Sequence, residues 1–468
     1  MRDWDEGKLL ATNAPHPNPL PKRERGTVRF YLTQSEQTTY CIYMSQFPLI
    51  QKTLPSGLRT IIMPRAEMAS ATILVLIGVG SRYETPRQSG LSHFLEHMFF
   101  KGTENRPTTK EIAEAIDNVG GEFNAFTTEE FTGYYVKVAS EHLERGADVV
   151  SDILLRPLFP VEEIERERGV IQEEIKMYTD NPMRHINNLW QKVMFGEHPL
   201  GKRVDGYKET VAAMKRKDFL AYVKSHYHTG NAIVVVAGNV DVKKTHKLLG
   251  SLFSPLVVGN ETIPKNAPKS LPAQRFVHEY RKNLDQTHMM VGVPGVASRD
   301  PRKYQAELMA AILGGGMSSR LFLNVRERNG LAYMIRTSSE SYTDTGSFVT
   351  QTGVRTEKAL DALAIILSEY DRMMEELVSE DELYKVKQMA RGNSVLDLEE
   401  TNALALFASV QELTEHEVLT PSEIMKHIDA VTPEDIQTLA RELLSKQKRS
   451  VALLGPQKSS KPFEKLLA

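Results

Sequence analysis

Apolar and polar positions follow two different periods along the chain, and the changes of period predict a fold with both helices and strands. From Met44 onward, apolar runs at 58–63 and 71–79 have the length and β-branched content of buried strands, and strand-like alternation returns at 122–130 and 132–139. Segments with helical spacing lie at 90–100, 107–121, 141–155 and 160–178. The helix in 107–121 carries its own signals, because Thr108 and Glu111 have the spacing of a capping box.

The order of these elements occurs twice, which predicts a duplicated domain. The stretch "HMMVGVPGVASRDPRKYQAELMAAILGGGMSSRLF" (288–322) repeats the strand, loop and helix of "TILVLIGVGSRYETPRQSGLSHFLEHMFFKG" (72–102). A polar, proline-rich stretch separates the two copies. The predicted parts are a disordered extension at 1–43, a first domain at 44–255, a linker at 256–274 and a second domain at 275–468.

Composition and charge exclude several classes of protein. With 468 residues, 41% of them hydrophobic, and a net charge of -2, the chain shows no sign of a nucleic-acid partner. Its single cysteine, Cys41, rules out an internal disulfide framework or a zinc cluster of several thiolates. The apolar run 71–79 is about half the length of a membrane span, and the first residues lack the pattern of a secretory signal. We expect no membrane span and a cytoplasmic location.

The stretch "GLSHFLEHMF" (90–99) is the strongest candidate for chemistry. On a helix, His93 and His97 are one turn apart on the same face, so both imidazoles can reach one metal ion. Glu96 lies beside them, where a general base for water is needed. The same face is also compatible with an ordinary solvated surface. A third ligand would come from 162–178, where Glu167 and Glu174 flank an apolar stripe, and spacing alone does not decide between them.

These motifs together resemble the pitrilysin-type zinc metallopeptidases, whose signature is the inverted H-x-x-E-H motif of inverzincins. The resemblance includes "HFLEH", "ERGVIQEE", "GGEFNAFTTEEFTGYY" and "GGGMSSRLFLNVRERNGLAY", and the length after Met44 is similar to that of the mitochondrial processing peptidase branch and its bacterial relatives. It implies an α+β fold of two duplicated α/β-sandwich domains, each a mainly antiparallel sheet packed by helices.

The resemblance also implies roles for individual residues. His93, His97 and Glu174 would hold one Zn²⁺ per chain, Glu96 would activate the attacking water, and Glu167 would orient the ligands from behind. An edge strand containing Phe123, Asn124, Ala125 and Phe126 would pair with an extended substrate. Arg326 and Tyr333, in the second domain, would bind substrate and steady the tetrahedral intermediate. Relatives often carry a basic residue and a histidine where this chain has Glu129 and Phe131, so subsite preferences do not carry over.

The function expected from this resemblance is that of a zinc-dependent endopeptidase that cleaves unfolded peptides or protein presequences inside a closed chamber. Two alternatives stay open: a non-catalytic scaffold, similar to the core-protein subunits of respiratory complexes, and a metal-binding module without hydrolysis. Loss of a ligand or of Glu96 would indicate a scaffold, and neither is lost. The expected partners are a peptide or unfolded protein substrate and a second copy of this chain in a homodimer.

Overall fold

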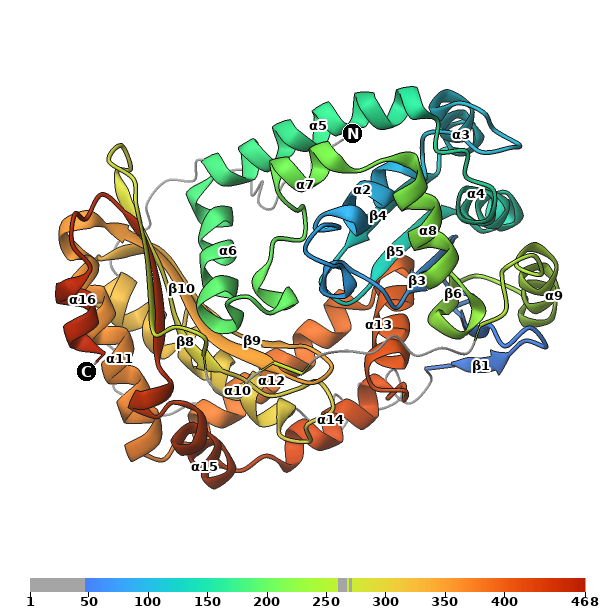
Figure 1. Ribbon diagram of the computed structural model, residues 1–468. Coiled ribbons are helices and arrows are strands. Elements are labelled where there is room, and N and C mark those ends of the chain that lie inside the picture. The colour runs from blue at the N-terminus through green and yellow to red at the C-terminus, as the bar shows by residue number, and fades with distance from the viewer. Residues whose placement is uncertain (1–46, 260–266, 269–271, 468) are drawn as a thin grey trace, which may run out of the picture. The chain divides into compact units, whose positions relative to one another are not determined.

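A computed structural model describes residues 47–259, 267–268 and 272–467 of the chain. The predicted extension 1–43 lies outside these residues, as does much of the predicted linker. Within the described part, the strands form two sheets (Figure 1). The first has the order β1-β2-β6-β3-β5-β4, with strands β1 (Ile50–Thr53), β2 (Arg59–Pro64), β3 (Ser70–Ile77), β4 (Glu122–Thr127), β5 (Thr132–Ala139) and β6 (Ala232–Gly238).

The second sheet repeats this order without the first strand, as the duplication predicts. Its order is β7-β11-β8-β10-β9, with strands β7 (Phe276–Tyr280), β8 (Gln286–Pro294), β9 (Ala332–Ser341), β10 (Gly346–Arg355) and β11 (Ser450–Gly455). In each sheet the pair β2–β6 or β7–β11 is parallel, and the other pairs are antiparallel. The α+β fold of two mainly antiparallel sheets packed by helices is therefore confirmed.

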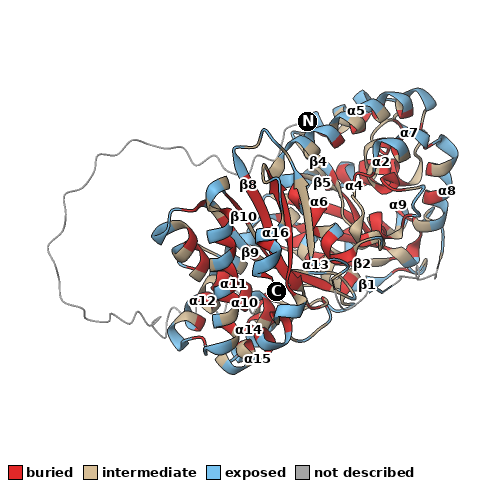
Figure 2. Cartoon of the chain, turned by 60° about the vertical axis from the view of Figure 1, so that its left-hand side comes forward, coloured by how far each residue is buried: buried red, intermediate tan, exposed pale blue. Residues whose placement is uncertain are grey.

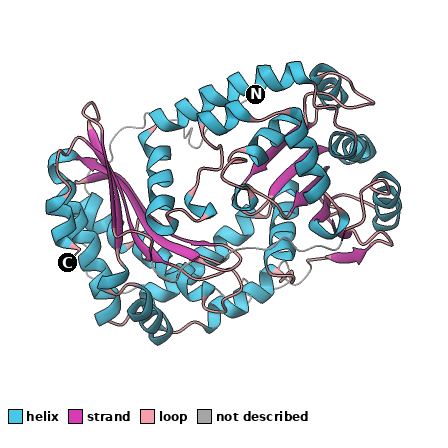
Figure 3. Cartoon of the chain, in the orientation of Figure 1, coloured by secondary structure: helices cyan, strands magenta, loops and turns pink. Residues whose placement is uncertain are grey.

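Helices cover both sheets, as Figure 3 shows. Those of the first half are α2 (Leu91–Met98), α3 (Thr109–Asp117), α4 (Leu143–Leu155), α5 (Val161–Asp180), α6 (Pro182–Phe195), α7 (Lys208–Ala213), α8 (Arg216–His226) and α9 (Val242–Leu252). Those of the second half are α10 (Lys303–Gly314), α11 (Ala359–Glu375), α12 (Glu380–Asp397), α13 (Thr401–Thr414), α14 (Pro421–Ala430), α15 (Pro433–Leu443) and α16 (Lys461–Leu466). The capping box expected at α3 is present, with Thr108 and Glu111 bonded reciprocally. No helix among the described residues is long and apolar enough to cross a membrane.

The central strands are buried on both faces (Figure 2), which explains why 71–79 is a continuous apolar run. Ile73, Val75 and Ile77 point into a core shared with helix α2 and its neighbours. Leu74, between them, points into a second cluster on the opposite face. Because side chains alternate across a strand, both faces of β3 must be apolar.

Two helices are exchanged between the halves. Helix α6 belongs to the first half of the sequence, yet Ile186 and Trp190 pack against Met290, Val349 and Ala452 of the second sheet. Helix α13 belongs to the second half, and it packs on the face of the first sheet opposite helix α2 (Figure 1). Its contacts there are Leu404, Ala405 and Ala408 against Ile61, Met63, Leu74, Ile233 and Val235. The predicted boundary at 256–274 therefore divides the sequence, whereas each sheet buries a helix from the other side of that boundary.

Candidate metal centre

Helix α2 presents its polar side chains away from the core because its apolar ones are fixed inside it. Leu91, Phe94, Leu95 and Met98 are fully buried. The start of the helix is fixed by the carboxylate of Glu84, which accepts hydrogen bonds from the backbone N–H groups of residues 90 and 92 at 2.7 and 2.6 Å. These N–H groups are among those that the first turn of a helix leaves without an intrahelical partner.

The structure brings His93, His97 and Glu174 together, although Glu174 comes from α5, far along the chain. Oε2 of Glu174 lies 3.6 Å from Nε2 of His93 and 3.6 Å from Nε2 of His97. The three side chains each offer a ligand atom, and these atoms lie within 4.8 Å of one another. Two imidazoles and one carboxylate are the protein ligands of a catalytic zinc, which keeps a further position open.

The protonation of His93 and the bonding of Glu174 fit a metal ion. Among the described residues, the buried atom Oε2 of Glu174 has no hydrogen-bond partner, which is unusual for a buried oxygen unless an ion takes that place. Burial, together with the neighbouring His97, lowers the pKa of His93 to about 3. His93 is therefore a neutral imidazole, as a zinc ligand must be.

Glu167 holds His97 from the side opposite Glu174. Its Oε1 lies 2.9 Å from Nδ1 of His97, and its Oε2 forms an ion pair with Nζ of Lys101 at 2.6 Å. Burial alone would raise the pKa of Glu167, but these two partners lower it, so the carboxylate is ionised. An ionised carboxylate at Nδ1 makes this nitrogen the donor and leaves Nε2 free to bind metal.

Glu96 is placed as the resemblance implies, next to the three ligands without being one of them. Its Oε2 accepts a 2.6 Å hydrogen bond from the hydroxyl of Thr127, the last residue of β4. Burial raises the pKa of Glu96 above its ordinary value, although the Thr127 bond opposes the shift. A carboxylate of raised basicity is better suited to accept a proton from water.

Three contacts at this site were not expected from the sequence: Thr127 on Glu96, Lys101 on Glu167, and Tyr178 on Glu174. The hydroxyl of Tyr178 donates to Oε1 of Glu174 at 2.7 Å, and the guanidinium of Arg184 stacks over the Tyr178 ring at 4.8 Å. Tyr178 also belongs to the apolar stripe that runs along its helix. Its i+4 spacing from Glu174 is a signal that could have indicated the contact.

The stretch Phe123–Phe126 lies in β4, which is the edge strand of the first sheet and pairs with β5 alone. Asn124 is exposed and Ala125 is buried, while Phe123 and Phe126 are half-buried. Helix α2 packs against this strand, so the free edge of the sheet lies next to the candidate metal centre. An exposed strand edge of this kind can accept an extended peptide.

Arg326 and Tyr333 lie together in the second half. The guanidinium of Arg326 is 5.0 Å from the centre of the Tyr333 ring, and Tyr333 is 81% exposed. Within the part of the chain that the structure describes, neither residue forms a hydrogen bond or ion pair with the three candidate ligands, so their role there stays a prediction. They occupy a π-helical turn, Phe322–Arg328, and the start of β9.

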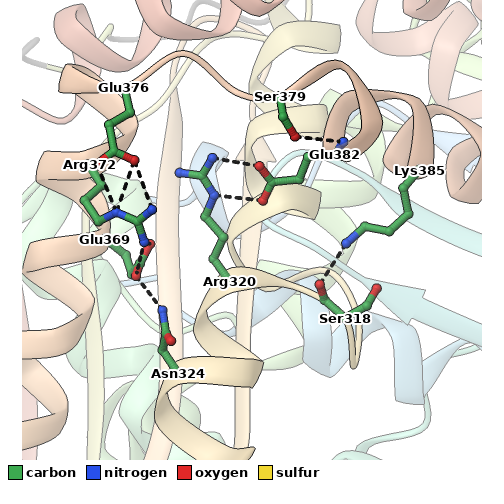
Figure 4. Close-up of polar contacts among 9 residues, drawn as sticks. All are labelled: Ser318, Arg320, Asn324, Glu369, Arg372, Glu376, Ser379, Glu382 and Lys385. Atoms are coloured by element: carbon green, nitrogen blue, oxygen red, sulfur yellow. Dashed lines mark hydrogen bonds and ion pairs between the residues drawn. The ribbon is translucent and has the colours of Figure 1, made fainter. Parts of the chain in front are cut away.

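Side chains from α11 and α12 support this turn (Figure 4). Glu382 receives two parallel 2.8 Å hydrogen bonds from Arg320, just before the turn. Lys385 donates to the backbone carbonyl of Ser318 at 2.8 Å. Within the turn, Asn324 donates to Glu369, which also pairs with Arg372. The half-buried Arg326 and the exposed Tyr333 are thus carried by a turn that several charge-assisted hydrogen bonds hold in place.

Comparison with known proteins agrees with this geometry. Residues 60–206 match the insulinase family (peptidase family M16), and residues 213–390 match the peptidase M16 inactive domain. An uncharacterized zinc protease of Streptomyces coelicolor is 36% identical over 413 residues, covering 87% of this chain and 89% of that protein. One of Bacillus subtilis is 34% identical over 410 residues, covering 86% and 97%. The chain belongs to the insulinase family, peptidase family M16.

Solved structures with the same fold include a protease from Helicobacter pylori, with a TM-score of 0.82, 22% identity and coverage of 88% of this chain and 100% of that one. A chain of complex III2 from Candida albicans has a TM-score of 0.77 at 17% identity, and the match covers 90% of this chain and 100% of that one. At these identities the likeness is one of fold. The relatives that share more sequence are named zinc proteases, and two imidazoles with one carboxylate are a donor set that fits zinc.

Proposed function

We propose that the chain is a zinc-dependent endopeptidase that holds one zinc ion and cleaves unfolded peptides or protein presequences. The observation that carries the proposal is the convergence of His93, His97 and Glu174 on one point, with the unpartnered Oε2 of Glu174 facing both imidazoles. Zinc bound there would polarise the scissile carbonyl and make water more acidic. Membership of a peptidase family and relatives named zinc proteases support the same reading.

Each residue at the site then has a separate task. Glu96 accepts a proton from the attacking water and later delivers it to the leaving amine. Thr127 holds the Glu96 carboxylate in one orientation through its 2.6 Å hydrogen bond. Glu167 keeps His97 in the tautomer that presents Nε2 to the metal, and Tyr178 restrains Glu174.

The substrate is proposed to lie along β4, adding a strand to the first sheet. The backbone of Phe123, Asn124, Ala125 and Phe126 would pair with it, which requires an extended and therefore unfolded segment. Arg326 and Tyr333 would complete the site by holding the carbonyl oxygen on which negative charge develops. Selection for extended chains explains how such an enzyme would spare folded proteins.

We propose further that two copies of the chain form a homodimer that encloses the chamber. The second half then supplies Arg326 and Tyr333 to the partner's zinc site or to its own. A two-fold interface is the commonest way for identical chains to close on each other. The alternative role, a non-catalytic scaffold, would leave the ligand set and Glu96 without a use.

One assay tests the enzymatic proposal. The purified chain is incubated with an unstructured peptide, before and after a zinc chelator and after zinc is added back, with Glu96→Gln as the matched control. Cleavage should disappear with the chelator, return with zinc, and be absent from the Glu96→Gln chain. A wild-type chain that binds zinc stoichiometrically and cleaves no unstructured peptide would instead be a metal-binding module or a scaffold.

A further inference from the structure

The turn between β4 and β5 (128–131) meets the turn between β9 and β10 (342–345), and this contact joins the two halves close to the zinc site. Thr343 donates to Glu130 twice, from its backbone N–H to Oε2 at 2.8 Å and from its hydroxyl to Oε1 at 2.7 Å. The two turns occupy equivalent places in the repeated sheets. Each half of the duplicated fold therefore contacts the other through the same hairpin.

A buried arginine binds both turns at once. Nη1 of Arg82 donates to Oε1 of Glu130 at 2.8 Å and to Oδ1 of Asp344 at 2.7 Å, and Nη2 donates to Oδ2 of Asp344 at 2.6 Å. The Arg82 side chain is only 2% exposed. Burial alone would lower its pKa, but Asp344 and Glu130 more than offset this and raise it. Asp344 is itself partly exposed, but a two-pronged pair with a buried arginine has a well-defined geometry.

The backbone around Arg82 is attached to the β4–β5 turn as well. The N–H groups of Ser81 and Arg82 donate to the carbonyls of Thr128 and Glu129 at 3.1 and 2.8 Å. A Cβ at Gly80 would lie 2.2 Å from the carbonyl oxygen of Thr128, so only glycine permits this approach. The turn and Arg82 therefore move as one piece.

This piece ends at the residue that holds the general base. Thr127 directly precedes the turn, and its hydroxyl donates to Glu96. Thr127 is the residue of β4 next to the turn. A shift of the turn would therefore move the Thr127 hydroxyl before it disturbed the rest of β4, where every residue is paired with β5. The path from Asp344 through Arg82 to Thr127 thus connects the second half of the chain to Glu96.

We propose that Arg82 and Asp344 are positioning residues for the reaction, using the second half of the chain to hold Thr127 and Glu96 in the geometry of proton transfer. This inference rests on the proposed peptidase function. It assigns the second half a task distinct from that of Arg326 and Tyr333, which would contact substrate. Since β4 itself stays paired, losing the contact should lower kcat and leave KM and zinc content unchanged.

The test uses Asp344→Asn in the full chain, with Asp371→Asn as the matched control. Asp371 also pairs with a buried arginine, Arg449, at 2.6 Å, and its side chain is about as exposed as that of Asp344. Both Asp371 and Arg449 lie in the second half, so this pair does not join the two halves. We expect Asp344→Asn to lower kcat about tenfold with KM within about twofold, as small misplacements of a catalytic group do. Asp371→Asn should keep full kcat at a comparable loss of thermal stability. Equal effects of the two variants on kcat, or no effect of Asp344→Asn, would overturn the proposal.

Two further readouts separate positioning from general damage. If Asp344 acts through Thr127, the double variant Asp344→Asn with Thr127→Val should have the same kcat as Thr127→Val alone. A double variant whose loss of kcat is the product of the two single losses would show independent action and refute the path. Hydrogen exchange needs no turnover. Asp344→Asn, and not Asp371→Asn, should speed amide exchange at 127–131. Unchanged exchange there would refute the proposal, whether or not the wild-type chain has peptidase activity. A wild-type chain without peptidase activity would count against the proposed function alone.

Discussion

Oε1 of Glu167 lies 2.9 Å from Nδ1 of His97, and Nε2 of the same ring faces Glu174 at 3.6 Å. One imidazole thus lies between two carboxylates of helix α5: Glu167 is hydrogen-bonded to Nδ1, and Glu174 faces Nε2 without a hydrogen bond. Lys101 compensates the charge of Glu167, while Glu174 has no such cation at Oε2 among the described residues. These different surroundings support the proposed roles, Glu174 as a ligand and Glu167 as the support of a ligand.

Removing the two glutamates should have different consequences for metal binding. Glu174→Ala deletes a ligand, so the purified chain should lose its stoichiometric zinc. Glu167→Ala leaves all three ligands and removes only the restraint on His97, so zinc affinity should fall by about 10 to 100-fold. Competitive titration against a chromophoric chelator measures both. If the two variants exchanged behaviours, Glu167 would be the ligand.

Glu96→Gln should retain zinc and lose turnover. The amide has nearly the shape of the carboxylate and can still lie beside Thr127, but it cannot accept a proton from water. We expect kcat to fall at least about 100-fold, the usual contribution of a general base. Metal analysis and rates are measured on the same preparation. More than about a tenth of wild-type activity would remove Glu96 from this role.

Truncation of Trp190 should destabilise the second sheet although the residue belongs to the first half of the sequence. Its ring is 1% exposed and packs with Met290 and Val349 of the second sheet. Trp190→Ala should lower the free energy of unfolding by about 3–5 kcal/mol, as for other buried aromatic residues. Val170→Ala, at a position 40% exposed on the neighbouring helix α5, is the control and should change it by under about 0.5 kcal/mol. Chemical denaturation that finds both variants equally stable would contradict the helix exchange.

The proposed homodimer can be tested for mass and for shared sites. Light scattering should give twice the mass of one chain. If Arg326 and Tyr333 act on the partner's zinc site, mixing inactive Glu96→Gln chains with inactive Arg326→Ala chains should restore activity, because a mixed dimer contains one intact site. Either variant mixed with itself is the control. A fully active monomer would refute the dimer, and a dimer without recovery would mean that each chain completes its own site.

Features that depend on residues close together along the chain could be predicted from the amino-acid sequence. Helix α2 with His93 and His97 on one face follows from a spacing of four, and the capping box of α3 follows from Thr108 and Glu111. The repeated order of elements predicted two sheets of like topology, and resemblance to a family named Glu174 as the third ligand. The first three of these signals lie within a few turns of helix or recur as a copied pattern, so they can be read along the chain, whereas Glu174 was named by the resemblance alone.

Contacts between residues far apart along the chain are seen only in the tertiary structure. Thr127 reaches Glu96 because β4 is the edge strand beside α2, and Arg82 reaches Asp344 because two hairpin turns 214 residues apart (130 to 344) come together. The exchange of α6 and α13 between the sheets is of the same kind, since an apolar helix face is compatible with either sheet until both are formed. Apolar patterning specifies that a face is buried, whereas the partner that buries it is chosen by the packing of the whole chain.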